Sequence, residues 1–183
     1  MWARLESNTI VEILSRPKAL QLGGVQYPSN IFSMWTDAEL ATLGIVPITV
    51  DRTNFKDKNY YINTDITYAY DTETGRATGT YGTATAKNLA ELKTEKKNFV
   101  NNDAANILSP TDWMVVRAAE GGTAVPSSTT TKRAAVRTKA NAMCTQIDAV
   151  SDVDALAALY VYTNTGTEES PEFTRPLGEL PTV

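Results

Sequence analysis

Histidine is absent from the sequence, and cysteine occurs once, as Cys144. Histidine is the usual general base near neutral pH and the commonest transition-metal ligand. Its absence excludes Ser-His-Asp, Cys-His and histidine-metal chemistry. A single cysteine cannot form an internal disulfide, which is consistent with synthesis in a reducing cytosol.

Long apolar segments and an excess of positive charge are also missing. No segment approaches the roughly 20 apolar residues that cross a bilayer, so we expect no membrane insertion. Lysine and arginine number 17 against 21 aspartates and glutamates, which gives a net charge of −4. The chain therefore has no overall positive field to attract nucleic acid. It also has no Gly-x-x-x-x-Gly-Lys loop, and we expect neither a nucleic-acid partner nor a cofactor.

The composition is that of a folded protein. The chain has 183 residues, of which 42% are hydrophobic and 21% are charged, and both values lie in the ordinary globular range. The patterning predicts an α+β fold in four parts. These are an N-terminal β-rich domain with a short helix (1–50), a β-hairpin segment (51–85), a helical domain (86–162) and an extended, proline-rich C-terminal tail (163–183).

The N-terminal domain is predicted to begin with short strands and to contain one capped helix. The strands are expected over residues 2–6, 9–14 and 25–27, the first two as a hairpin. Thr36 and Glu39 have the spacing of a capping box, which predicts a helix to about Leu43 followed by an extended segment. The expected core, with Trp35 as a structural anchor, consists of Ile31, Phe32, Met34, Trp35, Leu40 and Leu43.

The second segment alternates threonine and tyrosine around a turn at residues 71–75. This pattern predicts a hairpin of residues 60–70 with 76–83. It is more polar than a buried strand requires, so we expect one face to lie in solvent or against a partner. Five tyrosines could line a sugar-binding face: Tyr60, Tyr61, Tyr68, Tyr70 and Tyr81. Strand packing is the favoured interpretation, because the side chains of Tyr60 and Tyr61 must point to opposite faces of a strand.

Four helices are predicted after Thr85. The first is about 20 residues long and has an apolar stripe of Leu89, Leu92, Phe99, Val100 and Ile107. The second begins at Thr111 or Asp112, which are expected to cap it, and Trp113 is its structural anchor. The third begins near Ser127 with a stripe of Val136, Ala140, Met143 and Ile147. The fourth runs from Asp152 to about Tyr162, and the tail after it is expected to be loosely structured alone.

Candidate chemical groups have simpler structural explanations. Cys144 is expected to be a small buried apolar residue. Asp148, Asp152 and Asp154 lack the glycine and the distal glutamate of a calcium loop, so a helix boundary explains them better. Four basic residues are expected to form a solvated helix face: Lys132, Arg133, Arg137 and Lys139. We predict no metal site and no enzyme activity, and a carboxylate-pair glycosidase is the one enzyme class left open.

Two stretches resemble proteins of tailed bacteriophages. The first comprises Gly24-Val25-Gln26-Tyr27-Pro28, Ile31-Phe32, Trp35-Thr36-Asp37-Ala38-Glu39-Leu40 and Leu43-Gly44-Ile45. It is similar to the start of small proteins encoded among tail and tail-fibre genes. The second comprises Leu108-Ser109-Pro110-Thr111-Asp112-Trp113, Arg117, Glu120, Pro126 and Arg133-Ala134-Ala135-Val136-Arg137. It resembles the helical segment of the tail-assembly chaperone-like family that carries the Thr-Asp-Trp motif.

The resemblance implies a non-enzymatic tail protein, made in the host cytoplasm and located in the virion tail. We expect it to contact other tail or tail-fibre proteins, and copies of itself, in a symmetric assembly. The alternatives are a cytosolic chaperone of tail-fibre assembly and a host-glycan-binding module. The residues expected to contact partners come from the hairpin and the tail: Tyr68, Tyr70, Tyr81, Phe173, Leu177 and Leu180.

Overall fold

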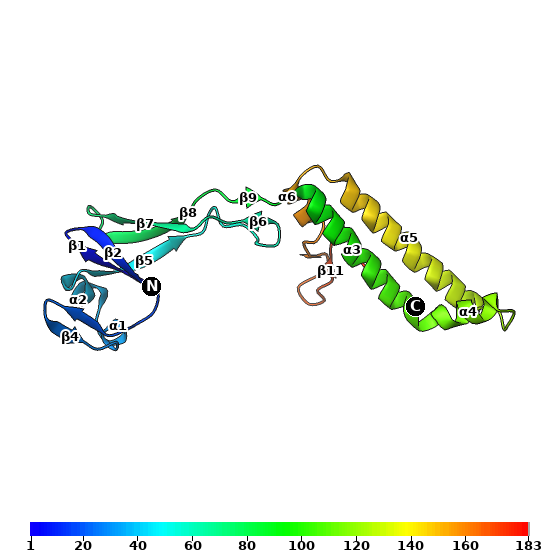
Figure 1. The fold of residues 1–183 in the computed structure, drawn as a ribbon, viewed down its shortest axis with the longest axis horizontal. Coiled ribbons are helices and arrows are strands. Elements are labelled where there is room, and N and C mark those ends of the chain that lie inside the picture. Colours follow the sequence, from blue (N-terminus) through cyan, green and yellow to red (C-terminus); the bar gives the residue numbers. More distant parts are fainter. Residues whose placement is uncertain (183) are drawn as a thin grey trace. The chain divides into compact units, whose positions relative to one another are not determined.

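The computed structural model describes residues 1–182 and confirms a mixed α+β fold. The chain divides into two compact units, Met1–Thr85 and Ala86–Val183. The first is a sheet unit and the second is a helical unit (Figure 1). The predicted segments 1–50 and 51–85 thus form one unit, because strands from both enter the same sheet.

Five strands make up the main sheet of the first unit. In spatial order they are β2 (Thr9–Leu14), β1 (Trp2–Glu6), β5 (Ile45–Asp51), β8 (Arg76–Tyr81) and β7 (Ile66–Asp71). All neighbours are antiparallel except β5 and β8, which pair in parallel and so join the second hairpin to the N-terminal strands. Cα atoms of the edge strands β2 and β7 approach within 8 Å, so the sheet is curled.

The β1–β2 hairpin was predicted with these bounds. The conformation of its two-residue turn explains why the chain reverses direction at Ser7-Asn8. Ser7 and Asn8 both have positive φ, 50° and 63°. Two left-handed residues form the turn whose twist matches that of the flanking strands, and asparagine tolerates this conformation better than most residues.

Two small helices and a short hairpin, separate from the five-stranded sheet, complete the core of the sheet unit. They are β3 (Leu20–Leu22), β4 (Val25–Tyr27), α1 (Ile31–Met34) and α2 (Asp37–Thr42). Ile31, Phe32 and Leu40 are buried, as expected. Met34 and Trp35 are exposed. The single turn of α1 places Ile31 and Phe32 in the core, and Trp35 follows the helix as its C-terminal cap. Trp35 instead packs edge-on against Tyr27, with ring centroids 6.0 Å apart, so its prediction as a buried anchor is wrong.

The capping box of α2 is formed as predicted. The Glu39 amide donates to the Thr36 hydroxyl at 3.3 Å, and the Thr36 amide donates to the Glu39 carboxylate at 2.7 Å. The backbone amide of Thr36, and then its hydroxyl, lower the pKa of the Glu39 carboxyl.

Thr36→Ala is expected to lower the free energy of unfolding of the sheet unit by about 1 kcal/mol, because one amide at the helix start loses its acceptor. Thr42→Ala is the matched control. It removes a hydroxyl that bonds the Glu39 carbonyl at the other end of the same helix, where no cap is lost. Urea unfolding monitored by circular dichroism measures both, and equal effects would contradict the capping role.

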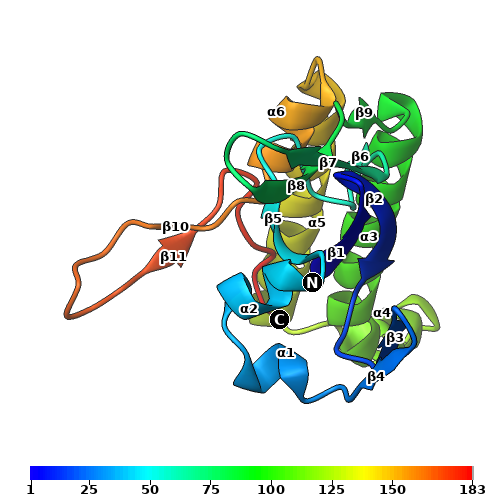
Figure 2. The ribbon, with the colours of Figure 1, turned by 90° about the vertical axis from the view of Figure 1, so that its left-hand side faces the viewer.

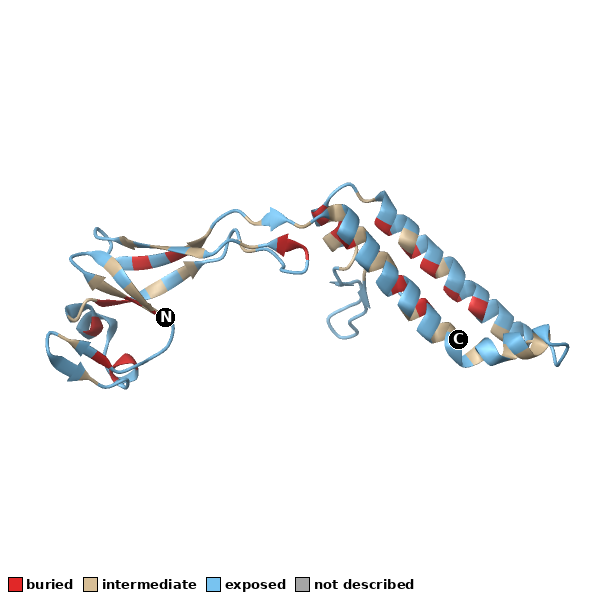
Figure 3. Cartoon of the chain, viewed as in Figure 1, coloured by how far each residue is buried: buried red, intermediate tan, exposed pale blue. Residues whose placement is uncertain are grey.

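The helical unit is built on two long helices. α3 (Leu89–Leu108) and α5 (Ser127–Ala149) lie side by side and run in opposite directions, joined by a 3-10 turn (Ser109–Thr111) and α4 (Asp112–Ala119). The predicted stripe of Val136, Ala140, Met143 and Ile147 is buried throughout. On α3, buried residues include Leu92 and Val100, whereas Phe99 is exposed. Figure 3 shows buried positions along both helices.

The C-terminal segment packs onto these helices after α6 (Val153–Ala158). The Leu177 side chain is 0% exposed. Its amide donates to the Leu159 carbonyl at 3.1 Å, and its carbonyl accepts from Lys139 Nζ at 3.2 Å. The expectation of a loosely structured tail is therefore wrong around Leu177. The two-stranded arm formed by β10 (Thr163–Asn164) and β11 (Phe173–Thr174) projects from the helices (Figure 2).

Candidate interaction site

A buried arginine organises the turn between α3 and α5. Arg133 is 4% exposed. One guanidinium nitrogen donates to the Leu108 carbonyl at 2.7 Å and to the Thr111 hydroxyl at 2.5 Å, and the other donates to the Asp112 carboxylate at 2.6 Å. A charged donor thus satisfies a carbonyl at the end of α3 and fixes the first residue of α4.

This network changes the interpretation of two residues, Arg133 and Thr111. Arg133 was expected on a solvated basic face, and it is buried instead. Thr111 does not cap α4 within the described chain, because its hydroxyl donates to Leu108 and accepts from Arg133. Spacing could have indicated the position of Arg133, which precedes Val136 by three residues and so continues the buried stripe of α5.

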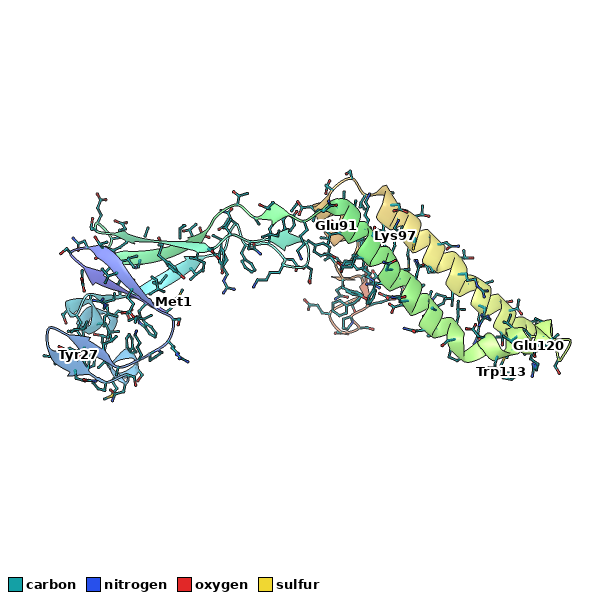
Figure 4. The ribbon with its side chains drawn as sticks, in the orientation of Figure 1. Met1, Tyr27, Glu91, Lys97, Trp113 and Glu120 are labelled. Carbon is teal, nitrogen blue, oxygen red and sulfur yellow. The ribbon has the colours of Figure 1, made fainter. Side chains whose placement is uncertain are left out.

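The turn presents an exposed tryptophan. Trp113 is 55% exposed, and Val116, one helical turn later, is also 55% exposed. The guanidinium carbon of Arg117 lies 4.8 Å from the centre of the indole ring. We call Trp113 and Val116 the α4 surface; Trp113 and Glu120 mark this end of the helical unit in Figure 4. The prediction that Trp113 is a buried anchor is wrong, because none of the residues of α4 is buried.

At the other end of the helix pair, lysines near the start of α3 contact Asp148 near the end of α5. Lys97 Nζ lies 2.7 Å from the Asp148 carboxylate, and Lys93 donates to the Asp148 carbonyl at 2.9 Å. The Asp152 carboxylate accepts from the Ala155 amide and caps α6. These aspartates therefore have helix-boundary roles. Among residues 1–182 there is no cluster of three cysteine or acidic residues that could hold a metal ion.

Cys144 lies on α5, one turn before Asp148, and is partly buried. Desolvation raises the pKa of its thiol, and the Asp148 carboxylate raises it further, while Lys97 acts in the opposite direction. The thiol is therefore protonated at neutral pH, which is consistent with a packing role.

The tail forms one wall of a cavity of about 270 Å³, which is otherwise lined mainly by α3, with Met143 contributed by α5. Leu177 and Leu180 contribute to this wall. Arg175 lies between two aromatic rings, 5.5 Å from Tyr160 and 5.2 Å from Tyr162, and forms an ion pair with Glu179. Leu177 is therefore a core residue rather than a partner contact, whereas Phe173 on the arm is exposed.

The hairpin tyrosines have different environments. Tyr70 packs against the core of Ala3, Val46 and Ala77. Tyr60 and Tyr61 are buried. Tyr68 and Tyr81 line an open hollow at the other end of the β7–β8 pair, together with residues that the sequence did not suggest, among them Phe55, Lys58 and Asp65.

Among the described residues, no helix combines the length and apolarity needed to span a bilayer. Comparisons with protein-family models, with curated proteins and with solved structures found no match.

Proposed function

We propose that this chain is a non-enzymatic structural component of a phage tail or tail fibre, and that the α4 surface contacts a neighbouring subunit of a symmetric assembly. The phage context rests on the resemblance of the two sequence stretches. The contact rests on one observation, the exposed Trp113 on a turn that Arg133 ties together through hydrogen bonds to Leu108, Thr111 and Asp112.

Exposure and rigidity together favour an interface. Solvent-exposed tryptophan is uncommon, and tryptophan is enriched among the residues that dominate binding energy. A ring held on an ordered turn loses little conformational freedom when a partner covers it. The motif Pro110-Thr111-Asp112-Trp113 then has two functions: Thr111 and Asp112 fix the turn through Arg133, and Trp113 makes the contact.

Variants of the α4 surface are expected to fold normally and to fail in assembly. Trp113→Ala and Val116→Asp alter exposed side chains, so their melting temperatures should stay near that of the wild type. Their abundance in purified particles should fall about tenfold or more, as expected for loss of a central contact. Val161→Asp is the matched control, an exposed valine of the same unit away from α4. Normal incorporation of both α4 variants would contradict the proposed contact.

The alternative is a tail-fibre assembly chaperone that uses the same surface and leaves before the virion is complete. Quantitative mass spectrometry of purified wild-type particles separates the two roles. Stoichiometric protein in the particle contradicts the chaperone. If the protein is absent from particles but required for fibre incorporation, the structural role is contradicted.

A further inference from the structure

The structure assigns to the sheet unit a binding site that is distinct from the α4 surface of the helical unit: a hollow that fits a neutral hexopyranose. It is about 480 Å³ in volume and is lined by Phe55, Lys58, Asn63, Thr64, Asp65, Ile66, Tyr68 and Tyr81. This site is independent of the α4 surface, so either proposal can fail without the other.

Tyr68 contributes an aromatic ring to the lining of the hollow. Tyr68 on β7 is directly opposite Gly79 on β8. A Cβ atom at Gly79 would lie 2.9 Å from Tyr68 Cε1, so the absence of a side chain lets the ring approach the neighbouring strand. Rings that lie along a surface in this way present a face on which the C–H groups of a pyranose can stack.

The aromatic wall of the hollow is fixed before any ligand binds. Phe55 packs on Tyr81 with ring centroids 5.0 Å apart and an interplanar angle of 61°. Asn54 donates to the Tyr81 carbonyl at 3.0 Å. The Asn63 side chain accepts from the Lys56 amide and donates to the Lys56 carbonyl, each at 2.8 Å. The loop that carries Phe55 is therefore held at several points, which lowers the entropy cost of binding.

Polar groups at the rim complement sugar hydroxyls. The Asp65 carboxylate is exposed and has no hydrogen-bond or ion-pair partner within residues 1–182. It can accept hydrogen bonds from two neighbouring hydroxyl groups. The Lys58 ammonium, 5.8 Å from the centre of the Phe55 ring, can donate to a third. One acidic and one basic group give the rim no net charge, which favours a neutral sugar over a phosphate or an acidic sugar.

Asp65→Asn tests the site with little risk to the fold, because the Asp65 side chain is exposed. The full-length chain is applied to an array of oligosaccharides that includes neutral and acidic hexopyranoses. Affinity for the best neutral sugar is then measured by saturation-transfer NMR with its methyl glycoside. Asp65→Asn should weaken binding by about tenfold or more, because a charged acceptor is lost. Tyr81→Ala should abolish binding.

Two controls distinguish this hollow from other surfaces. Glu73→Gln changes a carboxylate in the turn at the far end of the same hairpin, and Phe173→Ala removes an exposed ring from the helical unit; both should bind as the wild type does. Asp65→Asn keeps the test decisive if Tyr81→Ala unfolds the sheet unit. The proposal is overturned if no neutral hexopyranose binds, if only acidic glycans bind, or if Asp65→Asn leaves the affinity unchanged.

Discussion

Leu177→Ala is expected to lower the free energy of unfolding of the helical unit by about 2–5 kcal/mol, the usual range for removing a buried leucine side chain. The side chain is 0% exposed and forms one wall of the cavity beside Val100 and Met143. Leu177 is thus one of the buried apolar residues of the helical unit, and the tail supplies part of its core. For a unit of this size the melting temperature should fall by about 10 °C or more.

Thermal unfolding monitored at 222 nm measures this change in the full-length chain. Phe173→Ala is the control within the same segment, because Phe173 is exposed and should change stability by no more than about 0.5 kcal/mol. If both variants melted like the wild type, the tail would contribute nothing to the core. The sequence-based expectation of a loose tail would then be right.

The sequence predicted the elements that local rules control. The capping box of Thr36 and Glu39, the Ser7-Asn8 turn and the four-residue stripe of α5 each depend on residues close together in the chain. Hydrogen bonding to free amides, left-handed backbone geometry and helical periodicity are sufficient to recognise them.

Long-range pairing could not be predicted in the same way. The parallel pairing of β5 with β8 joins segments that the sequence assigned to separate parts. No local pattern specifies which edge a hairpin will join. The prolines of the tail suggested a loosely structured segment, yet Leu177 is buried, and its amide and carbonyl are hydrogen-bonded to the Leu159 carbonyl and to the Lys139 side chain.

The candidate sites were only partly visible in the sequence. Tyr68 and Tyr81 were named, but the side chains that complete their hollow, Phe55 and Asp65, come from the chain before β7. Trp113 was named for the wrong reason. Tryptophan in an apolar helix favours burial, and only the arrangement of the turn shows that this one is exposed.

Arg133→Met is expected to lower the free energy of unfolding of the helical unit by about 2–3 kcal/mol, because three charge-assisted hydrogen bonds are lost while most of the packing volume is kept. The effect stays below that of a fully buried ion pair, since the Asp112 side chain is 56% exposed and regains water. Arg137→Met is the matched control. That arginine lies one turn later on the same helix and is exposed, so its replacement should cost no more than about 0.5 kcal/mol.

Asp112→Asn and the double variant show whether the two residues act as a pair. Asp112→Asn leaves a buried guanidinium without its counter-charge, so it should also destabilise the unit. The double variant should lose less than the sum of the two single losses, with a coupling of about 1 kcal/mol or more. Strict additivity would mean that Arg133 acts through the Leu108 carbonyl, the Thr111 hydroxyl and its own packing, without Asp112. In that case Asp112 would not position α4. The α4 surface would then be held by the hydrogen bonds of Thr111 to Leu108 and Arg133.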